Sequence, residues 1–160
     1  MVSRERLAQL LAYEPVTGLF KWRVNRGRAR AGYVAGCLAS HGYWFIRVDG
    51  RLYTGHRLAW LYVHGSFPHD ELDHVNGVRS DNRLANLRPA SSRQNKGNTK
   101  LRSDNTSGYK GVVRSLSGWE AQIEVDGRCK RLGIFSEPQL AHAAYQQAAV
   151  SYFGEFARTS

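Results

Sequence analysis

The segment "ELDHVNGVRSDNRLANLRPASSRQN", residues 71–95, decides how the middle of the chain folds. Leu72 is a predicted core residue, and Asp73 and His74 follow it directly, before an Asn-Gly turn signal. We therefore predict a short strand over 72–75 that ends at this turn. The position of an acid and an imidazole side by side at the end of an apolar strand calls for a chemical explanation.

The rest of the segment predicts a long turn, a second strand and a helix. Residues 76–86 are rich in Asn, Asp and Gly, whose side chains can bond their own backbone. A short strand is predicted over 87–90. Ser91 and Gln94 then have the spacing of a capping box, so a helix is predicted to begin after Ser91. Asn95 falls in its first turn, near unpaired N–H groups and the positive end of the helix dipole.

Asp73, His74 and Asn95 converge if the strand end and the helix start face each other. Carboxylate and amide oxygens suit Mg²⁺ or Mn²⁺, and histidine can take a proton from water near neutral pH. Phosphodiester hydrolysis needs a base and a cation. Adjacent strand residues point to opposite faces, so this convergence requires the strand to end or twist there. The alternative is that Asp73 caps a turn, His74 lies on the surface and Asn95 is an ordinary helix residue.

Toward the N-terminus, the sequence predicts a helix, a basic arm, a hairpin and a second helix. The first helix is predicted over 3–12, with Ser3 as its cap. Residues 23–32 are basic and contain glycine, which is typical of a mobile arm or loop suited to phosphate contact. A β-hairpin with an Asp-Gly turn is predicted over 42–55. The second helix is predicted over 56–65, stopped by its final glycine.

Toward the C-terminus, a polar linker over 98–108 precedes three predicted strands and a helix. The strands are predicted over 109–114, 119–125 and 128–135, and an Asp-Gly turn closes the hairpin between the last two. A second Ser-x-x-Gln capping box begins at Ser136, with proline in the first turn of the helix. Alanines on this helix form a small-residue face, which indicates close packing on the sheet.

The charge of the chain indicates a polyanionic partner. Lys and Arg number 23 against 13 Asp and Glu, which gives a formal charge of +10 and a pI near 10.1. The excess is concentrated, because residues 21–57 hold eight basic residues and one acid, and residues 79–114 hold nine and two. Nucleic acid is the first candidate partner. The alternative is a protein that is basic without binding a polyanion.

Composition argues against membrane and disulfide-rich classes. No apolar run approaches the length of a membrane helix, and no charged-then-apolar leader opens the chain. Cys37 and Cys129 lie far apart and form no C-x-x-C pair, which argues against a disulfide framework or a cysteine zinc site. We predict that each cysteine is a small buried hydrophobe. These observations predict a soluble intracellular protein.

A long ordered motif covers "HRLAWLYVHGSFPHDELDHVNGVRSDNRLANLRPASSRQNKGN", residues 56–98. Its pattern of H-R-L, D-H, D-N-R-x-x-N-L-R and Q-N-x-x-N strongly resembles the homing-type HNH endonucleases, often encoded by phages and mobile introns. The resemblance implies a ββα-metal (His-Me finger) nuclease core in which His74 is the general base and Asp73 and Asn95 hold the metal. Asn86 would tie the hairpin and orient the histidine. No motif position is lost, which favours an active enzyme.

Other residues of the motif have open roles. His56 matches a family histidine, and a supporting role beside the site competes with packing or capping. Asn82 is a further candidate supporting residue, for which a turn or cap role is the alternative. Basic residues of this region are candidates for DNA phosphate contact, with a solvated surface as the alternative: Arg57, Arg83, Arg88, Arg93 and Lys96.

Residues 107–157 resemble an AP2-type DNA-binding domain. The matching parts are Y-K-G-V, W-x-A-x-I, L-G-x-F and the A-A-Y helix. The resemblance implies a three-stranded antiparallel sheet packed on one helix, with the sheet in the major groove of DNA. Glu124 and Arg131 stand where plant-type relatives often carry Arg and Trp, so no target sequence transfers. The DNA-contact candidates by position are Lys110, Arg114, Trp119, Gln122, Glu124, Lys130 and Arg131, and sheet packing is the alternative for Trp119.

Together these observations predict an α+β protein with a ββα-metal nuclease core and an AP2-like DNA reader. The predicted boundaries are 1–55 for the basic N-terminal helix and hairpin region, 56–100 for the core, 101–108 for the linker and 109–160 for the reader. The predicted function is cleavage of double-stranded DNA with Mg²⁺ or Mn²⁺, by nicking or double-strand cutting. No membrane or small-molecule substrate is expected.

Several alternatives stay open from the sequence. One rival is a non-enzymatic, sequence-specific DNA-binding regulator that keeps the HNH segment as a scaffold. A second is an RNA-directed nuclease or binder. The protein is expected as a monomer or homodimer in the cytoplasm of a bacterial host, encoded by a phage or mobile element.

Overall fold

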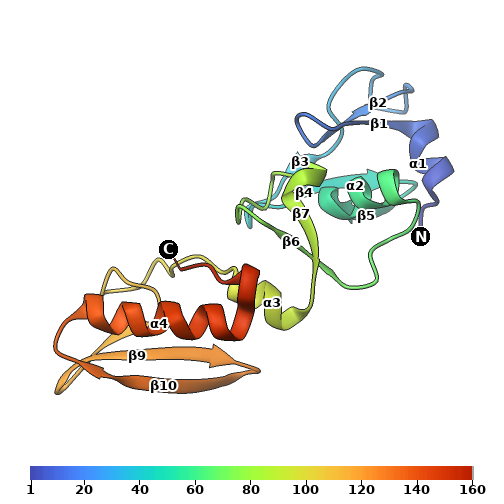
Figure 1. The fold of residues 1–160 in the computed structure, drawn as a ribbon. Coiled ribbons are helices and arrows are strands. Elements are labelled where there is room, and N and C mark those ends of the chain that lie inside the picture. The colour runs from blue at the N-terminus through green and yellow to red at the C-terminus, as the bar shows by residue number, and fades with distance from the viewer. Residues whose placement is uncertain (160) are drawn as a thin grey trace. The chain divides into compact units, whose positions relative to one another are not determined.

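The computed structural model describes residues 1–159, which combine helices with several small sheets, so the α+β class is confirmed. The chain divides into two compact units, Met1–Pro89 and Ala90–Ser160, called here the N-terminal and C-terminal units. Figure 1 traces the elements of both. The four-part boundaries predicted from the sequence stay a prediction. None of the helices in the described residues is long and apolar enough to cross a membrane.

The N-terminal unit begins with the predicted helix, which is shorter than expected. Helix α1 (Arg4–Leu10) starts at the predicted cap, where the Ser3 hydroxyl accepts from the Arg6 N–H at 3.1 Å. The prediction of helix to residue 12 was wrong, because the chain becomes extended at Leu11. Strand β1 (Leu11–Glu14) then pairs antiparallel with β2 (Leu19–Trp22).

The predicted hairpin and second helix are present. Strands β4 (Trp44–Val48) and β5 (Arg51–Thr54) pair antiparallel, and the short β3 (Cys37–Leu38) adds to β4. The turn between β4 and β5 is made by Asp49 and Gly50 at φ 46° and 80°, as a tight two-residue hairpin requires. Helix α2 (Gly55–His64) ends at Gly65 in the left-handed conformation.

One hydrophobic core holds this unit together. Helix α1 contacts α2 and β1, and α2 contacts β4 and β5. The buried side chains come mainly from α1, α2, β1, β2 and β4, and Tyr53 of β5 packs against them partly buried. The basic arm is also partly ordered, since Arg26 and Ala29 form an isolated β-bridge. The largest fully buried apolar side chains of the core are Leu7, Leu11, Phe20, Ile46, Leu58 and Val48.

The deciding segment folds in the predicted order. Strand β6 (Glu71–His74) pairs with β7 (Leu87–Ala90), and the 3₁₀ turn η1 (Leu84–Asn86) comes just before β7. Helix α3 (Ser92–Gly97) follows, and Ser91 and Gln94 form the full capping box that was predicted. Strand, long turn, strand and helix therefore occur as expected.

The C-terminal unit is a three-stranded antiparallel sheet covered on one face by a helix, as Figure 1 shows. The helix α4 (Pro138–Phe153) packs on buried side chains of β9 (Gly118–Val125), and η2 (Gly154–Phe156) extends it. The predicted second capping box is wrong, because Glu137 is the N-cap and makes no side-chain cap bond. The sheet order is β10-β9-β8, and the bounds are β8 (Val112–Ser115), β9 (Gly118–Val125), β10 (Arg128–Phe135) and α4 (Pro138–Phe153).

The two cysteines are exposed, which corrects the prediction that they are buried. Cys129 lies in the first half of β10, where four consecutive residues are exposed because this part of the strand has little covering it. Cys37 lies in the two-residue strand β3, which is exposed throughout. Neither forms a disulfide within the described residues.

Candidate active site

Asp73 and His74 end strand β6 with both side chains out of solvent. Asp73 is 4% exposed and His74 is 5% exposed. The strand stops at the histidine, because the Gly77 N–H donates to the His74 carbonyl at 2.7 Å and closes a turn. The prediction that this strand must end beside the acid–imidazole pair is confirmed. The alternative in which His74 is a surface residue is wrong.

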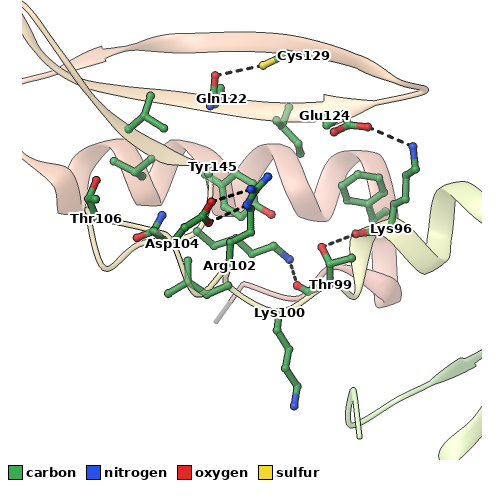
Figure 2. Close-up of a pocket in the computed structure, with 18 residues that line it drawn as sticks. Lys96, Thr99, Lys100, Arg102, Asp104, Thr106, Gln122, Glu124, Cys129 and Tyr145 are labelled. Atoms are coloured by element: carbon green, nitrogen blue, oxygen red, sulfur yellow. Dashed lines mark hydrogen bonds and ion pairs between the residues drawn. The ribbon is translucent and has the colours of Figure 1, made fainter. Parts of the chain in front are cut away.

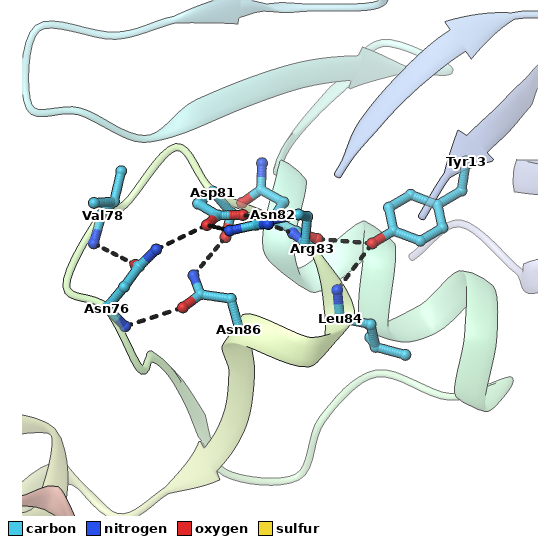
Figure 3. Close-up of polar contacts among 8 residues, drawn as sticks. All are labelled: Tyr13, Asn76, Val78, Asp81, Asn82, Arg83, Leu84 and Asn86. Atoms are coloured by element: carbon cyan, nitrogen blue, oxygen red, sulfur yellow. Dashed lines mark hydrogen bonds and ion pairs between the residues drawn. The ribbon is translucent and has the colours of Figure 1, made fainter. Parts of the chain in front are cut away.

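Asn86 closes the loop that separates the two strands. Its side-chain oxygen accepts from the Asn76 N–H at 3.0 Å, and its side-chain NH₂ donates to the Asp81 carbonyl at 2.9 Å. Its own carbonyl accepts from the Val75 N–H at 2.9 Å. Figure 3 shows this amide between the two arms of the loop. Asn86 therefore fixes the main chain that follows His74 directly.

Asp81 is the charged centre of the same loop. Its carboxylate accepts from Asn76 Nδ2 at 2.8 Å and from the Arg83 guanidinium at 2.8 and 2.6 Å. These bonds hold the pKa of Asp81 at about 2. Tyr13 of β1 ties the loop to the core, since its hydroxyl donates to the Asn82 carbonyl at 2.8 Å and accepts from the Leu84 N–H.

A second histidine and a tyrosine pack around His74. The His56 ring lies edge-on to the His74 ring with centroids 5.1 Å apart, and the Tyr43 ring lies 5.4 Å from His56 and 6.0 Å from His74. Burial lowers the pKa of His56 to about 3, with a further contribution from the His74 charge. The structure thus places the His56 ring in contact with the His74 ring, and a supporting role for His56 stays a prediction.

Burial also lowers the pKa of His74. The Asn82 amide and the Asp73 carboxylate act in the opposite direction, and the net shift is downward. The imidazole is therefore neutral at neutral pH and is able to accept a proton. A neutral histidine beside an acid, shielded from bulk water, has the chemistry expected of a general base.

Asn82 is the most buried polar residue of the site, at 1% exposed. Its side-chain amide has no hydrogen bond of ordinary geometry within residues 1–159, although it lies near enough to His74 to act on its pKa. The amide fits because Gly55 opens helix α2 beside it. A Cβ at Gly55 would stand 2.6 Å from Asn82 Nδ2. Asn82 therefore lies beside the His74 imidazole. Asn86 instead holds the loop that follows His74.

The predicted metal ligand Asp73 forms an ion pair with an arginine. Arg88 of β7 approaches Asp73 Oδ2 with Nε and Nη2, each at 2.9 Å, and both side chains are largely buried. The carboxylate suits a hard cation, but Arg88 competes for one oxygen. Residues 1–159 contain no group of three or more His, Cys, Asp or Glu placed to hold a metal. Asn95 lies in α3, in the other compact unit, so its pairing with Asp73 stays a prediction.

Most predicted DNA-contact residues have partners within their own unit. In the N-terminal unit, Arg57 lies over the Phe67 ring at 5.7 Å. In the C-terminal unit, the basic side chains of the ion pairs are all well exposed, so each pair contributes only about 0–1 kcal/mol and can open toward a phosphate. The remaining contacts are Arg93–Asp126 at 3.3 Å, Lys96–Glu124 at 3.2 Å, Arg131–Glu120 at 3.3 Å, Lys130–Tyr152 at 3.2 Å, Cys129–Gln122 at 3.2 Å and Arg114 over Trp119 at 4.8 Å.

Lys110 differs from the other cations. Its ammonium donates to the carbonyls of Gly97, Thr99 and Arg158, and burial lowers its pKa to about 8. It joins the end of α3, the following loop and the C-terminal tail. The same loop, residues 99–106, lines a pocket of about 550 Å³ together with parts of β9 and α4, as Figure 2 shows. The sequence predicted a linker here and gave no sign of a pocket.

Sequence reasoning missed three residues that form the site. Tyr43 and Arg79 come from two loops that meet beside His74, and Asp81 organises the loop that contains it. Asp81 is the aspartate of the D-N-R part of the motif, but no function was predicted for it from the sequence. Tyr43 gives no local signal, because its contact depends on the packing of a distant hairpin.

Comparison with known proteins gives one match. Residues 53–96 match a family model described as HNH endonuclease, which suggests nuclease activity for this segment. The match begins within β5 and runs through β6 and β7 into α3, so it includes His56, Asp73, His74, Asn82 and Asn86 but not Tyr43. No curated protein and no solved structure matches the chain. The chain is therefore similar to HNH endonucleases over about a quarter of its length.

Proposed function

We propose that this protein is a metal-dependent DNA endonuclease. The observation that carries the proposal is the buried, neutral His74 beside Asp73 at the end of β6, within the segment that resembles HNH endonucleases. The charge of +10 supports a polyanionic substrate.

In the proposed step, His74 takes a proton from water and the resulting hydroxide attacks phosphorus. The bond from phosphorus to the 3′ oxygen breaks, and the departing oxygen takes a proton from solvent water, which leaves a 5′-phosphate on one fragment and a 3′-hydroxyl on the other. Asn86 holds the loop that follows His74, and Asn82 and His56 keep the His74 imidazole in place. Asp73 and Asn95 are the residues we assign to hold Mg²⁺ or Mn²⁺, which when bound supplies charge stabilisation to the phosphate and the departing oxygen.

The finer features of the proposal follow the two resemblances. Strands β6 and β7 with helix α3 have the chain order of a ββα-metal motif. The sheet β8–β10 with α4 has the composition of an AP2-like reader, which would narrow the choice of site. We extend the proposal to a homing-type nuclease of a phage or mobile element, acting as a monomer that nicks or a dimer that cuts both strands.

One observation favours the rival function of a non-enzymatic DNA-binding regulator. The Arg88 guanidinium neutralises the Asp73 carboxylate that a cation requires. If this ion pair persists on DNA, the segment acts as a scaffold and the protein only binds.

A plasmid assay separates these two functions. Supercoiled plasmid is incubated with the protein and Mg²⁺ or Mn²⁺, with and without EDTA, and the end groups of any product are identified. We expect open circles or linear forms with 5′-phosphate ends, only when metal is present. Plasmid that stays intact while bound under every condition would support the regulator. Stronger competition by RNA than by DNA at matched salt would indicate an RNA target.

A further inference from the structure

Three arginines lie between His74 and the end of β7, and two of them are paired with a carboxylate. Arg83 is paired with Asp81 and Arg88 with Asp73, through bonds of 2.6 to 2.9 Å. The remaining one, Arg79, is exposed and makes no ion pair within residues 1–159. It is therefore the cation of this loop that is available to an external anion.

Arg79 is held in one place by neutral partners. Its Nη1 donates to the His41 carbonyl at 3.1 Å, and its Cζ lies 5.1 Å from the centre of the Tyr43 ring. Its aliphatic stem passes Gly42, where an added Cβ would stand 3.8 Å from Arg79 Cβ. A carbonyl and a ring face fix the guanidinium without cancelling its charge. Its remaining N–H groups keep their capacity for a phosphate.

The aromatic partner of Arg79 also contacts the general base. The Tyr43 ring lies 6.0 Å from the His74 ring and 5.4 Å from the His56 ring. The Arg79 guanidinium lies 5.1 Å from the centre of the same ring, so the Arg79 and His74 side chains are both neighbours of Tyr43. A phosphate bound by Arg79 would therefore stand close to the imidazole.

We propose that Arg79 binds the phosphodiester that is cut and holds it beside His74, with Tyr43 as the platform for its guanidinium. This inference rests on the proposed nuclease function, and it names a residue that the sequence did not single out. The ligand is a nucleic-acid phosphate, because a planar guanidinium with uncommitted donors matches the oxygens of phosphate in a two-pronged way.

The test uses Arg79→Ala and Arg79→Lys in the full chain, with Arg47→Ala as a matched control. Arg47 is also exposed and also donates to a carbonyl, that of Gly50 at 2.9 Å, but it lies in β4 beside the hairpin turn. Two quantities are measured: the cleavage rate constant with enzyme saturating over plasmid, and the dependence of the DNA dissociation constant on salt.

We expect Arg79→Ala to lower the cleavage rate constant by about 100-fold or more, as loss of a positioned phosphate donor does. The slope of log K against log salt should fall by about 0.9, the value for one phosphate contact. Arg79→Lys should recover part of the rate, and Arg47→Ala should cleave at the wild-type rate. Wild-type cleavage by Arg79→Ala would overturn the proposal, and so would an unchanged salt slope.

The salt slope also separates this inference from the nuclease proposal. If the wild-type protein binds DNA without cutting it, the proposed activity fails. Arg79→Ala would still reduce the slope if the arginine contacts a phosphate. A slope that falls while cleavage stays normal would place Arg79 on a phosphate away from the cut, and would overturn its positioning role.

Discussion

Single side chains set the geometry of the candidate site, and Asn86 is the clearest case. Its amide makes two bonds, to the Asn76 N–H and the Asp81 carbonyl, that hold the loop after His74 closed. Asn86→Ala leaves two partly buried main-chain groups without these partners, and each loss costs about 1 kcal/mol. We expect the free energy of unfolding to fall by about 2 kcal/mol, measured by urea denaturation.

Asn25→Ala is the matched control for this prediction. Asn25 also accepts from a loop N–H, that of Ala31 at 3.0 Å, but it is exposed. Its loss should cost well under half as much, because water replaces the bond. Equal losses in the two variants would show that Asn86 does not frame the loop.

His56 makes the stability of the protein depend on pH. Its pKa is about 3 in the folded protein and about 6.5 in an unfolded chain. As the pH falls, the unfolded state therefore binds a proton at His56 before the folded state does. Its contribution is complete above pH 6.5 and is lost as the pH falls from there toward 3. Between pH 6 and 4.5 we expect the free energy of unfolding to fall by up to about 1.4 kcal/mol per pH unit for this group.

His56→Gln should remove the part of the slope that His56 contributes, measured by urea denaturation at each pH. His74, whose pKa is also lowered, keeps a slope of the same sign in the variant. Asp49 and Asp81, with pKa values of about 2, lose their contributions only at lower pH, so they do not confuse the result. A variant with the same slope as the wild type would mean that His56 titrates normally.

At the scale of elements, the two Ser-x-x-Gln boxes give a direct comparison. Ser91 caps α3, with its hydroxyl accepting from the Gln94 N–H, whereas Ser136 lies outside α4 and caps nothing. We expect Ser91→Ala to lower the free energy of unfolding by about 1 kcal/mol. Ser136→Ala should change it by less than about 0.5 kcal/mol. Urea denaturation measures both, and similar values for the two would contradict the assigned caps.

The turns and caps that were predicted correctly are each specified by residues close together in the sequence. The Asp49-Gly50 turn, the Gly65 stop and the Ser91 box each depend on residues that are adjacent or nearly so, and all three are present. The Ser136 box failed because Pro138 begins the helix one residue later than the spacing suggests. Strand β1 was missed because its apolar residues continue the pattern of α1.

The site was predictable only where the motif names its residues. The place of His74 at a strand end follows from the turn signal after it, whereas its burial was not predicted and is shown by the structure. The contacts of Tyr43 and Arg79 depend on how the β3–β4 loop packs against a loop far along the chain. The Asp73–Arg88 ion pair depends on the register of two short strands, and no pattern in the sequence shows it.

For the whole molecule, charge predicts how binding depends on salt. A chain with 23 basic and 13 acidic residues should bind DNA largely through phosphate contacts that release counterions. We expect the dissociation constant for plasmid-length DNA to rise by about 100-fold or more between 50 and 200 mM salt, as four or more phosphate contacts require. Fluorescence anisotropy measures this, and affinity that is insensitive to salt would remove the charge argument for a nucleic-acid partner.

The measurement that tests the central claim most directly is the single-turnover rate of plasmid cleavage by His74→Gln. The control is His69→Gln, because the His69 side chain is fully exposed. DNA binding by both variants is measured in parallel. We predict that His74→Gln binds DNA like the wild type and does not cut it, whereas His69→Gln cuts at the wild-type rate. Cleavage by His74→Gln at the wild-type rate would contradict the assignment of His74 as the general base.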